Sequence, residues 1–380
     1  MKKILVVNIG TEIGGIEKCL INFLKYLDTR NCYVDLLLWK PAGPLFSQIP
    51  KSVSVLDRLG VGSFKEICKI KSFKEKLERI KIYMKYKKYG KKGQAWKALP
   101  IREDEYDIAI SYCQNGYSPY YVLDNVKASK KYMFYHHGSY EKSEKEYEYD
   151  KVAYLQFDKL ITVSRANKNM LLKYFPELEN RIEVIHNLID DKSIIEKAKE
   201  PLECFRKQDV LKITTVGRLS AEKGQQFALK VAHALKNRGI NYEWIFVGDG
   251  PEKEIDDKYV EENQLHENCY FVGSKENPYP YIQQADVYVQ TSSVEADPTT
   301  IQEAKVLNKK IIASDIPAIC ECLEGVLVAE TVPLDVDMFT KKIEDVLNNI
   351  KLPFNVNRNI NTESMAAMDI VFGLKDVMES

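Results

Sequence analysis

Short apolar runs alternate with helical patterns of apolar positions along most of the chain. The run Lys3–Val7 is almost uninterrupted, which is typical of a strand buried on both faces. Gly10, Gly14 and Gly15 follow it, and apolar residues then recur at intervals of three and four, which predicts a helix. Strand, glycine-containing loop and helix form the first unit of an open parallel sheet. The apolar positions of this helix are Ile16, Leu20, Phe23, Leu24 and Leu27.

Further apolar runs in the first half predict more strands of the same sheet. A helix is expected at Ala166–Phe175, with Ser164 in the N-cap position. The charged, strand-poor stretch Asp190–Asp209 is predicted to be a linker that includes a helix. The other expected strands of this half are Tyr33–Leu38, Tyr106–Ser111, Tyr132–Tyr135, Lys159–Ser164 and Ile182–Ile185.

A second alternation of strands and helices follows the linker. Gly224–Arg238 is predicted to be its first helix. Two consecutive series of this kind predict an α/β protein with two Rossmann-like domains that face each other across a cleft. The expected strands of the second series are Leu211–Val216, Tyr242–Val247, Asn268–Val272, Val287–Val289 and Lys310–Ala313.

Composition narrows the class of protein. The 380 residues exceed what one compact core usually holds, which agrees with two domains. Lys and Arg number 55 and so do Asp and Glu, so global charge favours no nucleic-acid partner. The eight cysteines show no zinc-ligand spacing, and no apolar run has the length of a signal peptide or a membrane span. We therefore expect a cytoplasmic protein with reduced thiols, no cysteine zinc site and no disulfide.

The stretch Thr291–Ala304 contains the richest chemistry. A helix is expected to begin near Thr299, and the unpaired N–H groups of a helix start attract phosphate. Thr299 and Thr300 add hydroxyl donors, Glu303 is placed to accept hydrogen bonds from ribose, and Glu295 from a sugar ring. A capped helix start with solvated acids is an equally good interpretation of this stretch alone.

A second stretch, Val216–Gly224, carries Arg218 and Lys223 on a strand-to-helix turn. Ligands of open α/β sheets bind at this edge, where two cations can neutralise a departing diphosphate as a magnesium ion does elsewhere. A surface loop of mixed charge is the alternative. The third stretch, Val247–Pro251, predicts a tight turn and nothing more by itself.

Taken in order, these motifs resemble glycosyltransferase family 4, whose members have the GT-B fold and are retaining, metal-independent enzymes. The likeness extends to the first half of the chain, so it covers nearly the whole sequence. The motifs are Gly14-Gly15, Val163-Ser164, Val184–Asn187, Gly217–Leu219, Lys223-Gly224, Val247–Pro251, Ala285-Asp286, and Glu295 with Glu303.

The resemblance implies a domain division and a set of donor-binding residues. The acceptor domain would span 1–192 and include a returning segment, 362–380, with a helix at Met365, Met368, Ile370 and Phe372. The donor domain would span 193–361. The implied donor-binding residues are Gly14, Gly15, Arg218, Lys223, Gly273, Ser274, Glu295, Pro298, Thr299, Thr300 and Glu303.

The implied roles follow the chemistry of each side chain. Arg218 and Lys223 would hold the donor diphosphate, Glu303 the ribose and Glu295 the sugar hydroxyls. Gly15 would let its loop approach the diphosphate. Gly273 and Ser274 would lie near the base, and Thr299 and Thr300 would offer backbone N–H groups to phosphate.

Two places qualify these roles. The family has Gly and an aromatic residue after the first Glu, whereas Ala296, Asp297 and Pro298 stand here, so the charge of Asp297 puts the identity of the donor sugar in doubt. His136 and His137 follow an expected strand. His137 aligns with a His-Gly pair of related capsule-type enzymes and is predicted to contact sugar or acceptor, whereas His136 is predicted to be structural.

The resemblance therefore implies a hexosyltransferase that uses a nucleotide sugar, with uridine diphosphate (UDP) as the expected nucleotide and no cofactor. Its catalytic residues would be Arg218, Lys223, Glu295 and His137, and attack on the front face of the sugar would retain configuration. The acceptor would be a glycan or a lipid-linked or protein-linked molecule of surface polysaccharide or glycoconjugate synthesis. An inactive accessory subunit and a GT-B nucleotide-sugar epimerase are the alternatives.

Residues 65–97 hold thirteen Lys or Arg against three Glu. One apolar stripe on a cationic helix is predicted, formed by Ile67, Ile70, Phe73, Leu77, Ile80 and Met84. Such a helix can lie on the anionic inner face of a membrane, or its stripe can pack on the first domain. Both interpretations stay open. Tyrosines accompany the lysines, but no RNA-binding motif does, so nucleic acid is not expected.

Overall fold

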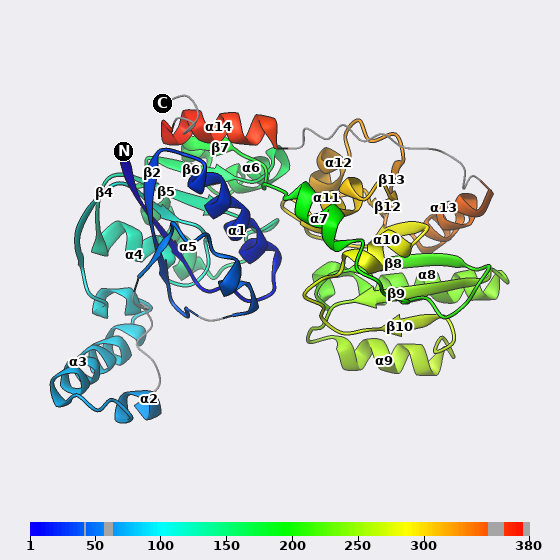
Figure 1. The fold of residues 1–380 in the computed structure, drawn as a ribbon, viewed down its shortest axis with the longest axis horizontal. Coiled ribbons are helices and arrows are strands. Elements are labelled where there is room, and N and C mark those ends of the chain that lie inside the picture. The colour runs from blue at the N-terminus through cyan, green and yellow to red at the C-terminus, as the bar shows by residue number, and fades with distance from the viewer. Residues whose placement is uncertain (42, 57–63, 349–360, 375–380) are drawn as a thin grey trace. The chain divides into compact units, whose positions relative to one another are not determined.

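The structure is a computed structural model that describes residues 1–41, 43–56, 64–348 and 361–374. These residues form two compact units (Figure 1). Unit 1 contains Met1–Val163, Asn167–Leu188 and the segment that begins at Thr362. Unit 2 contains Ser164–Ala166 and Ile189–Asn361.

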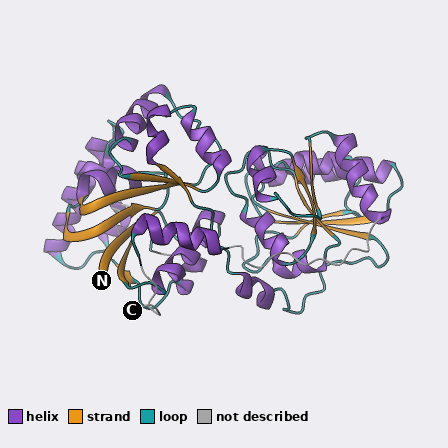
Figure 2. Cartoon of the chain, turned by 90° about the horizontal axis from the view of Figure 1, so that it is seen from above, coloured by secondary structure: helices purple, strands orange, loops and turns teal. Residues whose placement is uncertain are grey.

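Unit 1 is built on a parallel sheet of seven strands in the order β3-β2-β1-β4-β5-β6-β7. Helices cover both faces of this sheet (Figure 2). The strands are β1 (Lys2–Asn8), β2 (Cys32–Leu38), β3 (Ser54–Val55), β4 (Arg102–Ser111), β5 (Val126–Tyr135), β6 (Lys159–Thr162) and β7 (Ile182–Val184).

The helices of residues 1–188 and of the C-terminal segment are α1 (Gly15–Asp28), η1 (Pro44–Gln48), α2 (Phe64–Cys68), α3 (Phe73–Gly90), η2 (Ala95–Ala98), α4 (Ser118–Asn125), α5 (Glu144–Tyr154), α6 (Arg165–Leu172), η3 (Pro176–Arg181) and α14 (Thr362–Phe372).

The position of β1 in the middle of the sheet explains the apolar run Ile4–Val7 near the start of the sequence. Ile4 and Val6 point into a core shared with α1 and α14, whereas Leu5 and Val7 point into a core on the other face of the sheet. All four side chains are fully buried. An uninterrupted apolar run is the pattern that a strand covered on both faces requires.

The segment α14 belongs to unit 1, although all of unit 2 precedes it in sequence. Phe372 packs 5.8 Å from the ring of Phe23 on α1. Asp369 accepts two hydrogen bonds from the guanidinium of Arg30, at 2.6 and 2.9 Å. Met368 is also buried, but Ile370 is 82% exposed. The expectation that Ile370 packs inward is therefore wrong, because it lies on the opposite side of the helix.

Unit 2 has a six-stranded parallel sheet in the order β10-β9-β8-β11-β12-β13. Its strands are β8 (Leu211–Val216), β9 (Tyr242–Val247), β10 (Cys269–Phe271), β11 (Val287–Gln290), β12 (Lys310–Ser314) and β13 (Ala329–Val332). Its helices are α7 (Asp191–Lys197), η4 (Ala221–Lys223), α8 (Gln225–Asn237), α9 (Lys253–Glu262), α10 (Tyr279–Gln284), α11 (Thr299–Val306), α12 (Pro317–Cys322) and α13 (Val336–Asn348).

The prediction of two α/β units with Rossmann-like parallel sheets is confirmed. The short strands β3 and β13 were not expected. Both lie at an edge of their sheet; β3 has only exposed residues, and β13 has one buried residue, Val332, so neither leaves an apolar run in the sequence.

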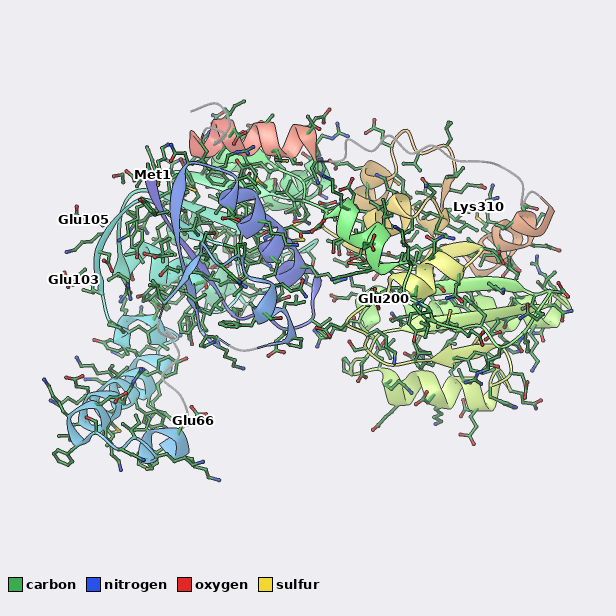
Figure 3. The ribbon with its side chains drawn as sticks, viewed as in Figure 1. Met1, Glu66, Glu103, Glu105, Glu200 and Lys310 are labelled. Carbon is green, nitrogen blue, oxygen red and sulfur yellow. The ribbon has the colours of Figure 1, made fainter. Side chains whose placement is uncertain are left out.

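The segment 65–97 differs from its prediction as one helix. The chain is interrupted after α2, and Ser72 caps a new helix, α3, by accepting a hydrogen bond from the N–H of Glu75 at 3.4 Å. Figure 3 draws the side chains of this segment, with Glu66 of α2 labelled. The residues of α3 that pack on the core of unit 1 are Ile82, Tyr83 and Tyr86, none of which belongs to the predicted stripe. Of the predicted stripe, Ile67 is buried but Phe73, Leu77 and Met84 are exposed, so the interpretation in which the stripe packs on the first domain does not hold for these three residues.

Candidate functional site

The carboxyl ends of β8 and β11 lie side by side at the centre of the unit 2 sheet. After β8 the chain forms β9 and β10, which lie on one side of β8 within the sheet, and then β11, which lies on its other side. The loops that follow β8 and β11 therefore diverge at a topological switch point, where ligands of open α/β sheets bind. Arg218 and Lys223 belong to the first loop, and Glu295 to the second.

The loop after β8 rests on the turn that follows β9. Gly248 has a φ of 155°, and a Cβ there would collide with the carbonyl oxygen of Gly217. The N–H of Leu219 donates to the carbonyl of Asp249 at 3.1 Å. The Gly-Asp-Gly-Pro turn therefore supports the loop that carries Arg218, a function that its sequence alone did not reveal.

Backbone contacts also join the loops after β8 and β11. Gly224 has a φ of 71°, and a Cβ there would collide with the carbonyl oxygen of Thr291. The hydroxyl of Thr291 donates to the carbonyl of Gly224 at 2.9 Å, and the N–H of Ser293 donates to the carbonyl of Glu222 at 2.8 Å. These contacts fix the distance between the two loops, and with it the place of their charged side chains.

Lys223 and Glu295 meet across this junction. The Nζ atom of Lys223 lies 2.7 Å from Oε1 of Glu295. The side chain of Glu295 is only 8% exposed and that of Lys223 is 27% exposed. A carboxylate with so little access to water requires compensating donors, and the lysine is one of them. The lysine has three N–H donors, so it can bind an anion while it contacts Glu295.

Glu303 lies in the first turns of α11 and is buried. The hydroxyl of Tyr279, at the start of α10, donates to Oε1 of Glu303 at 3.2 Å. Burial, followed by the negative charge of Glu303, raises the pKa of Tyr279. The tyrosine is therefore neutral and acts as a hydrogen-bond donor to the carboxylate.

The helix α11 begins at Thr299, as predicted, with Pro298 in the N-cap position. The N–H groups of Ile301 and Gln302 bond to the carbonyl of Pro298, at 3.1 and 3.2 Å. The N–H groups of Thr299 and Thr300 precede any intrahelical acceptor, which is the arrangement that attracts phosphate. The hydroxyl of Thr300 donates its hydrogen to Oε1 of Gln290 at 2.9 Å. That hydrogen is therefore engaged inside the protein, contrary to the expectation of a hydroxyl donor to phosphate.

The remaining donor-site residues of unit 2 lie on neighbouring loops. Arg218 is exposed, and among the described residues no hydrogen bond or ion pair engages its guanidinium. Gly273 accepts a hydrogen bond from the N–H of Gly248 at 3.0 Å, so the loops after β9 and β10 are joined, and Ser274 follows as an exposed residue.

Asp297, the residue that departs from the family pattern, is 8% exposed. Its Oδ1 atom accepts a hydrogen bond from Gln302 of α11 at 2.6 Å. One oxygen of this carboxylate is thus held by the helix that follows it.

Gly14, Gly15 and His137 lie in unit 1. Gly14 precedes α1, and a Cβ on it would collide with the carboxylate of Glu17, whose pKa burial raises. His137 follows β5, and its Nδ1 atom lies 3.2 Å from the N–H of Ser139. The carbonyl of His137 accepts a hydrogen bond from Asn167 at 2.6 Å, which holds the residue in place.

The neighbouring His136 differs from His137. Its Nε2 atom is buried, and its ring stacks on Phe134 with centroids 5.6 Å apart. Burial lowers the pKa of His136 to about 4, so the ring is neutral near pH 7. This setting fits the structural role expected of it.

Within unit 2, hydrogen bonds connect Lys223 to Glu295, Glu295 to Gln290, and Gln290 to Thr300. The adjoining loops carry Arg218, Gly273 and Ser274.

The sequence did not point to Gln290 or Tyr279. A polar residue at the end of an apolar strand was a signal for Gln290. Tyr279 lies 24 residues from Glu303, and no spacing rule connects them.

The described residues contain no group of three or more His, Cys, Asp or Glu side chains placed to hold a metal ion. No described helix combines the length and apolar character needed to cross a membrane.

Comparison with known families matches both halves of the chain. Residues 13–193 match the model described as "Glycosyltransferase Family 4", and residues 196–362 match "Glycosyl transferases group 1". An uncharacterized glycosyltransferase of Methanocaldococcus jannaschii is 25% identical over 231 residues, which are 57% of each chain. The O-antigen biosynthesis glycosyltransferase WclY of Escherichia coli is 28% identical over 200 residues, 50% of this chain and 54% of that protein. The chain thus spans little more than half the length of these relatives.

Solved glycosyltransferase structures share the fold. HepE from Anabaena, in complex with UDP and glucose, has a TM-score of 0.67 at 16% identity and covers 100% of this chain and 97% of its own. A variant of S. aureus TarM, in complex with fondaparinux, alpha-GlcNAc-glycerol and UDP, has a TM-score of 0.67 at 14% identity, with 97% of each chain covered. The fold is therefore GT-B.

Proposed function

Since the chain belongs to glycosyltransferase family 4, we propose that it is a retaining hexosyltransferase that moves a sugar from UDP to an acceptor hydroxyl. One observation carries the proposal. Lys223 and Glu295 are in contact, 2.7 Å apart, at the switch point of the unit 2 sheet. A cation and a buried carboxylate at this place suit the two ends of a nucleotide sugar, its diphosphate and its sugar hydroxyls.

The reaction needs few groups from the protein. The bond between C1 of the sugar and the diphosphate oxygen breaks, and a bond between C1 and the acceptor oxygen forms on the same face. The proton of the acceptor hydroxyl passes to the departing diphosphate. Lys223 and Arg218 stabilise the negative charge that develops on the diphosphate, and Glu295 orients the sugar by accepting hydrogen bonds from its hydroxyls.

We propose that this chemistry needs no metal ion, because the two cations take the place of one at the diphosphate. The N–H groups at the start of α11 would add dipolar stabilisation. Glu303, held by Tyr279, would accept hydrogen bonds from the ribose, and Gly273 and Ser274 would border the base. His137 and the Gly14-Gly15 loop are the contributions proposed for unit 1.

The acceptor is proposed from the names of relatives. WclY is named for O-antigen biosynthesis, and a relative from Campylobacter jejuni, 25% identical over 162 residues, for transfer to a diphospho-undecaprenol-linked sugar. We propose a glycan or lipid-linked acceptor in the synthesis of a surface polysaccharide or glycoconjugate.

The donor site is tested by titrating the protein with UDP, GDP, ADP and their glucose conjugates in a calorimeter, with a chelator present. We expect UDP and its sugar to bind without metal, and Arg218→Ala to weaken binding about tenfold. Arg238→Ala, on the far end of α8, is the matched control and should bind normally. If no nucleotide binds, the accessory-subunit alternative replaces the proposal. Interconversion of free nucleotide sugars without acceptor would favour the epimerase.

We also propose that α3 holds the protein on the anionic inner face of the membrane, where a lipid-linked acceptor would lie. Phe73, Leu77 and Met84 are 76%, 42% and 63% exposed. At about 100° per residue, these three fall on one side of the helix, nearly opposite Ile82 and Tyr86, which pack on unit 1. Lysines flank this open apolar side, so its charge complements an anionic lipid surface.

Vesicle sedimentation tests this surface. We expect the protein to bind vesicles of phosphatidylcholine with phosphatidylglycerol, and to be released by salt or by omission of the anionic lipid. Phe73→Ser with Met84→Ser should reduce binding several-fold. Ile255→Ser with Ile370→Ser removes two equally exposed apolar residues elsewhere and serves as the control. Equal binding by both double variants would refute the assignment of α3.

A further inference from the structure

The side chain of Gln290 connects three parts of the proposed donor site. Gln290 is the last residue of β11 and is 4% exposed. Its Nε2 atom donates to Oε1 of Glu295 at 2.7 Å and to the hydroxyl of Ser292 at 3.2 Å. Its Oε1 atom accepts from the hydroxyls of Thr300 at 2.9 Å and Tyr288 at 3.1 Å. Two donors and two acceptors thus surround the amide.

These partners permit one orientation of the amide. The ionised carboxylate of Glu295 has no hydrogen to give, so the amide atom that faces it must be the nitrogen. The oxygen then faces the hydroxyl of Thr300 and that of Tyr288, whose one hydrogen is shared with the carbonyl of Val216 at 3.3 Å. A buried amide with all its partners in place is rigid, because any rotation leaves a polar atom unpaired in the interior.

The same contacts orient Glu295. Its Oε1 atom accepts from three donors: Lys223 Nζ at 2.7 Å, Gln290 Nε2 at 2.7 Å and Ser292 Oγ at 2.8 Å. Among the described residues, no hydrogen bond engages Oε2. A carboxylate whose first oxygen is filled offers its second oxygen to a ligand. Since the carboxylate is held by strand, loop and lysine, the position of Oε2 is fixed before a ligand arrives.

We propose that Gln290 is a positioning residue for the donor sugar, which acts through Glu295 and fixes Oε2 as the acceptor of sugar hydroxyl hydrogen bonds. This inference rests on the proposed function. Through Thr300 at the start of α11 and Lys223 on the opposite loop, the same amide ties the sugar-contacting carboxylate to the proposed diphosphate site. Gln290 itself touches no substrate.

The test separates the affinity for the sugar from the affinity for the nucleotide. Dissociation constants for UDP, UDP-glucose and UDP-N-acetylglucosamine are measured by calorimetry for the wild type and for Gln290→Met, which keeps the chain length but loses the amide. We expect UDP to bind Gln290→Met within about threefold of the wild type. The added affinity that a UDP-sugar shows over UDP should fall about tenfold, because Glu295 loses one of its donors.

Two further variants show whether Gln290 acts through Glu295 or only through stability. Gln226→Met removes a half-buried amide of unit 2, which donates to Asp256 at 2.5 Å, and should lower the melting temperature without changing either affinity. In a Glu295→Gln background, Gln290→Met should cause no further loss of sugar affinity, since the group it positions is already altered.

The outcomes are distinct. If the wild type binds no nucleoside diphosphate, the proposed function fails and this assignment fails with it. If nucleotides bind but Gln290→Met lowers the affinities for UDP and UDP-sugars equally, or no more than Gln226→Met does, the positioning role is wrong while the proposed function stands. Additive losses in the Glu295→Gln background would also overturn it.

Discussion

The carboxyl edges of the two parallel sheets carry different chemistry on the same architecture. In unit 2, the loops after β8 and β11 meet through the pair of Lys223 and Glu295. In unit 1, the loops after β4 and β5 meet through uncharged groups. Oε1 of Gln114 accepts from the N–H of His136 at 3.0 Å, and the ring of His136 lies 5.0 Å from that of Tyr112.

Titration behaviour sharpens this contrast. Burial lowers the pKa of His136 to about 4 and raises the pKa of Glu17. Both shifts favour the neutral form, so the unit 1 edge disfavours charge where the unit 2 edge pairs it. An edge that carries an ion pair suits a diphosphate, and an edge built from rings and amides suits a sugar rich in hydroxyls. The proposed division into donor and acceptor units agrees with this difference.

The charged edge should show the largest effect. Lys223→Met removes a cation from the place where diphosphate charge is proposed to develop, so we expect sugar transfer to fall about 100-fold or more. Turnover is measured as UDP release from the donor with acceptor present. Lys258→Met, an exposed lysine of α9, is the control. Undiminished turnover in Lys223→Met would remove the basis for the contrast.

The neutral edge should contribute less. His137→Ala is expected to lower turnover about tenfold while the affinity for UDP stays within twofold, because the residue is assigned to sugar or acceptor and not to the nucleotide. His233→Ala on α8 is the matched variant. A large loss of UDP affinity in His137→Ala would show that the unit 1 edge also handles the nucleotide.

A smaller effect is expected at Tyr279. The phenylalanine variant loses the hydrogen bond to Glu303, so UDP should bind about three to ten times more weakly. The loss should shrink for 2′-deoxy-UDP, because Tyr279 is proposed to act through a carboxylate that binds ribose. Tyr281→Phe, two residues away, is the control for loss of a hydroxyl. An equal loss for both nucleotides would contradict the ribose contact.

A carboxyl group away from both edges should affect stability and not transfer. Burial raises the pKa of Asp256 on α9 to about 6, above its ordinary 3.8. The folded state therefore keeps a proton that the unfolded state loses first. This contribution is fully present below about pH 4 and is lost as pH rises through 6, on the order of 2 kcal/mol.

Unfolding by urea between pH 4 and 7 checks this prediction. Asp256→Asn should remove this part of the pH dependence and leave turnover unchanged, whereas Asp257→Asn, an exposed neighbour, should retain it. If the two variants show the same pH dependence, the raised pKa of Asp256 is wrong.

The elements that the sequence predicted are those whose cause is local. A strand covered on both faces is largely apolar, so β1 was apparent from the run Ile4–Val7. The glycines and charges after β8 and β11 were apparent because parallel strands place their following loops at one edge. The helix start at Thr299 followed from the residues around it.

What the sequence did not predict depends on contacts between distant residues. The partners of Gln290 come from a strand, two loops and a helix, and nothing in the sequence orders them. The prediction of one helix with one apolar stripe in 65–97 failed for another reason. Its apolar residues occupy two sides of α3, and periodicity alone cannot tell which side packs on unit 1. The interruption before Ser72 further separates Ile67 and Ile70 from the rest of the stripe.

The position of α14 has a consequence for how the chain is made. Met368 and Phe372 lie in the same core as Phe23 of α1, and Arg30 finds its carboxylate partner in Asp369. Residues of unit 2 are synthesised between these partners. During translation, unit 2 can therefore reach its final packing while the first unit still has an open core. The earliest part of the polypeptide is thus the last to be completed, and a chain that ends before Thr362 lacks the ring of Phe372 that packs on Phe23.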